Sequence, residues 1–253
     1  MILALLRLGL IELHRGRFPL LALLIFAAAL TAAGGAGALL LAERQALQTG
    51  VLASLLRHGA IALLGLHVIA SQLREQHTGT SALLLTLEAP RTHYVIGKLG
   101  VCALAAAGLA VPAGLLLLLH GDSAGTLRWT LSLWCELFLV AGVALVLTFT
   151  LRGVVTAAAA LGGFYVLARA QGALELLAAD TAVVASSFGH GIATVVLHAV
   201  AWALPDLWRF TAAEWPARGG GDGADLALVL GQTAIYGLLL FAAAAADLYR
   251  RAF

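Results

Sequence analysis

The sequence has few charged residues. Of its 253 residues, 11% are Asp, Glu, Lys or Arg, whereas soluble domains carry roughly 25%. The formal net charge of +2 is too small to indicate a nucleic-acid partner. There are only two cysteines, Cys102 and Cys135, and both lie in apolar stretches, so no structural disulfide is expected. The shortage of charge argues against an ordinary water-soluble domain.

Long apolar stretches take the place of the missing charge. Phe18 to Ala42 is 25 residues without a charged side chain, and about 20 apolar residues cross the hydrocarbon core of a bilayer. A spanning segment must satisfy its own backbone hydrogen bonds, which favours helices. We therefore expect an all-α membrane protein, with residues 1–253 as a single domain. Its six expected spans are Phe18–Leu41, Val51–Ala70, Val95–Leu119, Leu127–Leu151, Val154–Ala168 and Leu226–Ala246.

Residues 1–17 are predicted to form an amphipathic helix on the membrane surface. Leucines recur there at a helical period, at Leu3, Leu6, Leu10 and Leu13. The charges inside the apolar run do not fit a cleavable signal peptide, and a polar face of this kind is typical of an interface helix. The charged residues of this helix and its end are Arg7, Glu12, Arg15 and Arg17.

The distribution of basic residues predicts the orientation, because cytoplasmic loops carry more Arg and Lys. With a cytoplasmic N-terminus, that side holds nine: Arg7, Arg15, Arg17, Arg74, Arg91, Lys98, Arg152, Arg250 and Arg251. The other side and its margins hold six: Arg44, Arg57, Arg128, Arg169, Arg209 and Arg218. Both termini are therefore expected in the cytoplasm.

Residues 169–225 are predicted to form an extracytoplasmic segment between spans five and six. It contains the apolar stretch Ile192–Leu204, which is too short to cross a bilayer. We expect a re-entrant or interfacial element there, on the outer face. The alternative is a seventh span, which would place the termini on opposite sides. The aromatic residues of the segment could instead contact an extracytoplasmic partner protein.

The link between spans two and three, residues 71–93, is the most distinctive part of the sequence. A short apolar helix is expected at Ala82–Leu87, between a Gly turn and Pro90. Pro90 disfavours a helical conformation at Ala89 and so separates this helix from span three. A helix this short is not stable alone in water, so a partner is expected to pack on it.

The link resembles the type-2 ABC-transporter permease family. Members of that family have a charged residue and Gly-Thr, a Leu-rich turn, and then Pro, Arg, an aromatic residue and Gly-Lys. The matching residues are Glu75, Gly79, Thr80, Leu84, Leu85, Pro90, Arg91, Tyr94, Gly97 and Lys98. Arg15-Gly16-Arg17, Leu204–Phe210 and Tyr249–Phe253 also resemble regions of the family, so the resemblance covers the whole chain.

The resemblance implies a homodimeric permease in the bacterial inner membrane, bound to two copies of a separate ATPase. The link would be a coupling helix that docks on that ATPase. Its expected docking residues are Glu75, Gly79, Thr80, Leu84, Leu85, Glu88, Pro90 and Arg91. A phosphate-binding loop requires Gly-Lys-Ser/Thr, whereas this chain has Gly97-Lys98-Leu99. The chain is therefore expected to be a non-catalytic subunit without a cofactor, and ATP and Mg²⁺ to bind the partner.

Other readings come from polar residues within the apolar stretches. Glu136 in span four is either a pathway carboxylate or a structural one, paired with Arg57 on span two. The eight histidines allow a membrane-embedded haem-binding or electron-transfer subunit, with His58–His198 or His67–His93 as candidate pairs from different segments. No metal site is expected. A third reading is a structural anchor that holds partners at the membrane.

Overall fold

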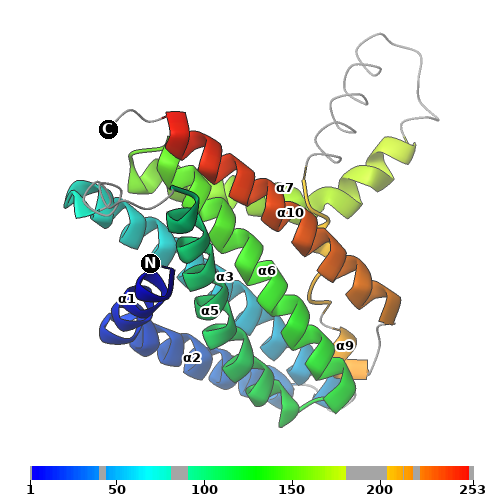
Figure 1. Ribbon diagram of the computed structural model, residues 1–253. Helices are drawn as coiled ribbons and strands as arrows, with labels where there is room; N and C mark the ends of the chain where they lie inside the picture. Colours follow the sequence, from blue (N-terminus) through cyan, green and yellow to red (C-terminus); the bar gives the residue numbers. More distant parts are fainter. Residues whose placement is uncertain are drawn as a thin grey trace.

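The computed structural model describes residues 2–39, 44–80, 91–180, 204–212, 214–218 and 223–250 (Figure 1). Among these residues every regular element is helical. The α-helices are α1 (Ile2–Arg15), α2 (Phe18–Leu39), α3 (Arg44–His77), α5 (Arg91–Leu118), α6 (Ser123–Thr150), α7 (Val154–Asp180), α9 (Glu214–Arg218) and α10 (Gly223–Arg250). One turn of 3-10 helix, η2, covers Leu207–Arg209.

Six of these helices are long and apolar enough to cross a membrane: α2, α3, α5, α6, α7 and α10. Within the part of the chain that the structure describes, this confirms the prediction of an all-helical chain with six helices that are able to span a membrane. Each of the six helices satisfies its own backbone hydrogen bonds, as a segment that crosses a bilayer must.

The predicted boundaries of two spans are too short. The second span was predicted at Val51–Ala70, but α3 runs from Arg44 to His77. The fifth was predicted to end at Ala168, but α7 continues to Asp180. In both cases polar and charged residues extend a helix beyond its apolar centre, because the backbone hydrogen bonds of a helix do not require apolar side chains. The predicted outer segment 169–225 therefore begins with twelve residues of α7, and the link 71–93 is reduced to the residues between α3 and α5.

Helix α6 lies at the centre of the bundle. It packs against α3, α5, α7, α9 and α10, and Trp129, Leu133, Leu137 and Val140 are fully buried along it. Helix α2 packs mainly on α3, and α10 covers α5 and α6 (Figure 1). The candidate span in α10 has only 11% of its residues buried, so most of its apolar surface is left to lipid or to another protein chain.

The helix ends gather at two opposite ends of the bundle. At the α9 end, Asp122 caps α6 by accepting a hydrogen bond from the Gly125 amide at 2.8 Å, as expected for an Asp N-cap. Thr49 of α3 donates to the carbonyl of His120 there at 3.0 Å. A Cβ atom on Gly125 would lie 1.9 Å from the carbonyl oxygen of Trp215, so only glycine permits this contact between α6 and α9.

The opposite end of the bundle, here called the α1 end, brings together α1, the start of α5 and the ends of α6 and α10. Leu5, Tyr94, Phe149 and Leu248 belong to one buried apolar cluster there. Figure 1 shows the start of α5 and the end of α10 on this side, close to α1. The predicted short helix Ala82–Leu87 lies outside the described residues, as does the predicted re-entrant element Ile192–Leu204 except for its last residue.

Candidate functional site

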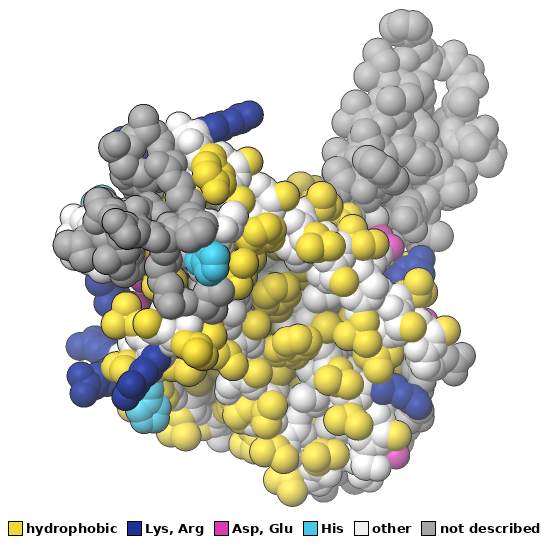
Figure 2. All heavy atoms as spheres, in the orientation of Figure 1, with side chains coloured by type: hydrophobic (Ala, Val, Ile, Leu, Met, Phe, Trp, Pro, Cys, Tyr) yellow, Lys and Arg dark blue, Asp and Glu magenta, His cyan; other side chains and the backbone are white. Residues whose placement is uncertain are grey.

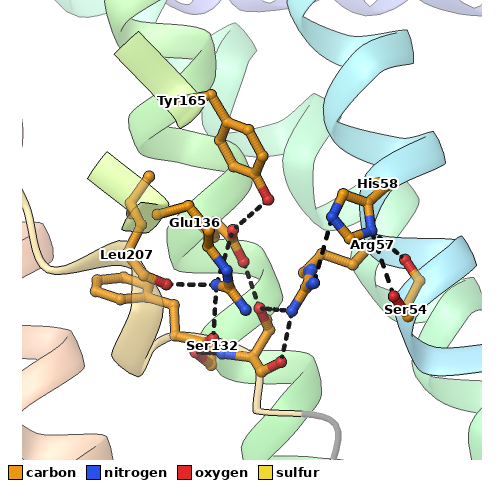
Figure 3. Close-up of polar contacts among 10 residues, drawn as sticks. Ser54, Arg57, His58, Ser132, Glu136, Tyr165 and Leu207 are labelled. Carbon is orange, nitrogen blue, oxygen red and sulfur yellow. Dashed lines mark hydrogen bonds and ion pairs between the residues drawn. The ribbon is translucent and has the colours of Figure 1, made fainter. Parts of the chain in front are cut away.

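A network of polar side chains lies inside the bundle, at the middle of three spanning helices (Figure 3). The buried polar network consists of Arg57 on α3, Ser132 and Glu136 on α6, Tyr165 and Arg169 on α7, and Thr211 in the segment that follows η2. Charged and polar groups in a spanning helix are costly unless they find partners. The partners of each group therefore indicate what the network does.

Glu136 is fully buried, and both of its carboxylate oxygens accept hydrogen bonds. The Tyr165 hydroxyl donates to Oε1 at 3.1 Å, and the Thr211 hydroxyl donates to Oε2 at 2.5 Å. The ion-pair partner is Arg169, whose Nη1 lies 3.5 Å from Oε1. The expected pairing of Glu136 with Arg57 is therefore wrong in its partner: Arg57 is connected to the carboxylate through the side chains of Thr211 and Tyr165.

Thr211 joins Arg57 to the carboxylate. Its carbonyl oxygen accepts a hydrogen bond from Arg57 Nη1 at 3.0 Å, and its amide donates to the Ser132 hydroxyl at 3.0 Å. Its φ angle of 47° is unusual for a β-branched residue. Such strain persists only where the surroundings hold it in place, and here α3 and α6 both form hydrogen bonds with Thr211.

Arg169 holds the same segment from the other side. Its Nη1 donates to the carbonyl oxygens of Leu207 and Phe210, the latter at 3.0 Å. Arg57 and Arg169 thus both bind backbone carbonyls of residues 207–211, with Glu136 between them. The arrangement fastens this segment to α3, α6 and α7, which is the behaviour of a structural carboxylate rather than of one open to a passing molecule.

His58 is engaged on both ring nitrogens. Its Nδ1 lies 2.7 Å from the Ser54 carbonyl oxygen, and its Nε2 lies 3.3 Å from Arg57 Nη2. A carbonyl only accepts and a guanidinium only donates, so Nδ1 carries the proton and Nε2 accepts. An imidazole held this way has no nitrogen left for haem iron. Its candidate partner His198 lies outside the described residues.

A second polar cluster lies at the α1 end and joins α3 to α5. Lys98 forms an ion pair with Glu75, and the Tyr94 hydroxyl lies 3.4 Å from the second Glu75 oxygen. The Gln72 amide donates to the Tyr94 hydroxyl at 3.1 Å. Glu75 and Lys98 are mostly shielded from solvent, with 14% and 17% of their side chains exposed. This set, Gln72, Glu75, Tyr94 and Lys98, is called the link cluster below.

Helix α1 packs directly on the start of α5. A Cβ atom on Gly97 would lie 2.8 Å from Leu5 Cδ1, and one on Gly100 would lie 2.8 Å from Leu6 Cδ2. Small residues of this kind allow helices to approach closely in a membrane. Glu12 of α1 also accepts a hydrogen bond from the Ser71 hydroxyl of α3 at 2.8 Å. The three helices α1, α3 and α5 are thus connected at this end.

The remaining predicted docking residues are only partly described. Gly79 has φ of 72° and follows the last turn of α3, where glycine is the common residue. The Thr80 hydroxyl lies 2.9 Å from that of Thr78, and Arg91 begins α5. Leu84, Leu85, Glu88 and Pro90 lie outside the described residues. Of the predicted interface-helix residues, Arg7, Arg15 and Arg17 are exposed.

Sequence reasoning missed Arg169, Tyr165 and Thr211 as members of the buried network. Arg169 had been placed at the beginning of the outer segment, where a charge needs no partner. A signal was present, because Tyr165 and Arg169 are four residues apart and so lie on one face of a helix. The strained backbone of Thr211 has no comparable signal in the sequence.

Comparisons with known proteins assign no family to the chain. No protein-family model matches it, and no curated protein matches it. Among the described residues, no three or more His, Cys, Asp or Glu side chains group together as metal ligands would. The two polar clusters and the six candidate spans are therefore the features of this chain that bear on its function.

Proposed function

We propose that this chain is the membrane-spanning permease subunit of an ATP-binding-cassette transporter. It moves or exports a substrate across the bacterial inner membrane, using ATP hydrolysed by a separate ATPase subunit. The observation that carries the proposal is the link cluster. Glu75, Tyr94 and Lys98 are three of the residues on which the resemblance rests, and their side chains meet across the two ends of the link.

The link cluster supports a mechanical role for the link. The stability of an ion pair that is shielded from solvent depends more strongly on its geometry, and on the presence of both partners, than the stability of an exposed pair does. A displacement of the docked link would therefore pull on α3 through Glu75 and on α5 through Lys98. It would reach α1 through the contact between Gly97 and Leu5. ATP-driven closure of two ATPase subunits would be transmitted to the spans along this route.

The distribution of charge supports a cytoplasmic α1 end and hence cytoplasmic termini. Outside the buried network, eight of the basic residues that the structure describes lie at this end: Arg7, Arg15, Arg17, Arg74, Arg91, Lys98, Arg152 and Arg250. Four of the described ones lie elsewhere: Arg44, Arg128, Arg209 and Arg218. Short cytoplasmic loops carry such an excess, and an ATPase would dock on that side.

The exposed surface supports a second copy of the chain as a partner. The candidate spans in α2, α7 and α10 have 17%, 22% and 11% of their residues buried. Figure 2 shows a broad apolar surface on one face, with basic side chains at its margins. Lipid covers part of this surface, and a homodimer would cover another part. In the segment that the buried network holds, the Trp208 side chain is exposed, which supports contact with an extracytoplasmic partner.

Reversing the charges of the link cluster tests this function. Glu75→Lys and Lys98→Glu are each expected to lower ATPase activity of the assembled complex at least about tenfold, because like charges then face each other in a shielded site. The double variant restores the opposite charges and is expected to recover most of the activity. The measurement is ATP turnover of the complex reconstituted in nanodiscs, with equal amounts of folded permease.

A matched control is a charge reversal at the same end but outside the cluster, such as Arg152→Glu, which should leave turnover within about twofold of the wild type. Single reversals with full ATP turnover would count against a coupling role for the link cluster. If the double variant did not recover activity, the ion pair would not be what couples the link to ATP turnover.

A further inference from the structure

A basic groove opens where α1, α2 and α3 meet at the α1 end. It has a cavity volume of about 530 Å³, which is within the usual range for small-molecule sites. Arg15 and Arg17 line it from the turn between α1 and α2, and Arg74 lines it from α3. All three side chains are exposed, and none forms an ion pair with a described residue. Figure 2 shows basic side chains gathered at this edge of the molecule.

The groove changes from charged to apolar along α3. Arg74 lies at its charged end, and Leu66 and Leu63 line it eight and eleven residues earlier. At 1.5 Å per residue, these positions are about 12 and about 16 Å from Arg74 along the helix. Leu21 of α2 faces them, and Leu21 and Leu66 are 44% and 52% exposed. A ligand in this groove would meet cations at one end and hydrocarbon at the other.

One acidic residue, Glu12, also lines the groove. Its carboxylate accepts a hydrogen bond from Ser71 at 2.8 Å, so it has a partner within the protein. Three arginines against this single carboxylate leave a formal excess of positive charge. Between the charged and the apolar end of the groove, α2 packs directly on α3: the centroids of the Phe18 and His67 rings are 4.7 Å apart.

We propose that the basic groove binds one anionic phospholipid. The phosphate would be held by Arg15, Arg17 and Arg74, because guanidinium groups bind phosphate oxygens through paired hydrogen bonds. The first part of an acyl chain would lie along Leu21 and Leu66, which continue into the lipid-facing surface. A free phosphate or nucleotide would leave the apolar half without a partner. A zwitterionic lipid brings its own cation, which the arginines would repel.

This inference does not rest on the proposed transport function. It requires only that the groove lies at the boundary between water and bilayer, where the surface charge and the exposed leucines put it. A bound lipid would connect the end of α1 to α3 from outside, next to the contact of Glu12 with Ser71. The groove would then set how firmly α1 is held against the bundle in membranes of different charge.

Native mass spectrometry of the purified chain tests the proposal. The probes are phosphatidylglycerol and phosphatidylcholine, added separately in detergent at equal concentrations. The wild type is expected to retain one phosphatidylglycerol at least about tenfold more tightly than phosphatidylcholine. The triple variant Arg15→Gln, Arg17→Gln, Arg74→Gln is expected to lose this preference. Because these side chains are exposed, the variant should still fold and run as a monodisperse species.

The matched control is Arg7→Gln, Arg152→Gln, Arg250→Gln, which removes the same charge from exposed positions at the same end. It should keep the preference, and an equal loss in both triple variants would overturn the groove as a specific site. Excess glycerol 1-phosphate, the soluble headgroup, should not displace the lipid. Displacement would assign the arginines to a free phosphate and would also overturn the proposal.

Discussion

Replacing Glu136 with Gln is expected to lower the free energy of unfolding by about 3 kcal/mol or more, because breaking a buried ion pair leaves an unpaired charge behind. Gln keeps the shape of Glu, but its single carbonyl oxygen can replace only one of the two oxygens that accept from Tyr165 and Thr211, because its NH2 group only donates. Arg169 and Arg57, however, would then lie inside the bundle without a counter-charge. The measurement is thermal or denaturant unfolding of the purified variant in detergent.

Two further variants separate a structural carboxylate from a pathway carboxylate. Glu214→Gln, at an exposed position on α9, is the matched control and should leave stability within about 0.5 kcal/mol of the wild type. Adding Arg169→Gln to Glu136→Gln removes one of the two unpaired charges and is expected to recover part of the loss, as coupled neighbours do. A Glu136→Gln variant with wild-type stability and no transport would instead identify a pathway residue.

Replacing Leu84 and Leu85 with Asp is expected to abolish binding of the ATPase while leaving membrane insertion intact. The two residues lie in the middle of the link, and an apolar docking face does not tolerate two carboxylates. The measurement is the amount of ATPase that co-purifies with the tagged variant in a mild detergent, together with the amount of permease in the membrane fraction.

The control for this experiment adds two carboxylates at the same end but outside the link. His14→Asp with Arg152→Asp changes two exposed residues and should leave ATPase binding unchanged. Unaltered binding by the Leu84→Asp, Leu85→Asp variant would remove the assignment of the link as a docking element.

The six spans could be predicted from the sequence because each has an apolar centre of sufficient length. Their ends could not, since the polar last turns of α3 and the twelve final residues of α7 follow no hydropathy rule. Arg169 illustrates the consequence. Treated as the beginning of a loop, it was given no partner, and Glu136 was assigned to Arg57 instead. In a sequence, a charged residue that has a counter-charge inside the bundle cannot be distinguished from a charged residue that marks the end of a span.

The link cluster was predicted only as a set of matching residues, without contacts. Glu75 and Lys98 are 23 residues apart, and no helical period relates them, because their meeting depends on how the chain turns between α3 and α5. In the sequence Gly97 is only part of a motif. The structure shows why a glycine is needed there: the Leu5 side chain lies where a Cβ atom would be. The basic groove likewise forms only when three segments of the chain come together. The sequence groups Arg15 with Arg17, but nothing in it places Arg74 beside them.

The most direct test of the central claim is co-purification of the tagged wild-type chain from its native membrane in mild detergent, with the bound proteins identified by mass spectrometry. We expect an ATPase that carries the phosphate-binding loop this chain lacks, at about one copy per permease chain. Redox proteins in place of an ATPase would contradict the permease assignment and would favour a haem-binding or electron-transfer subunit.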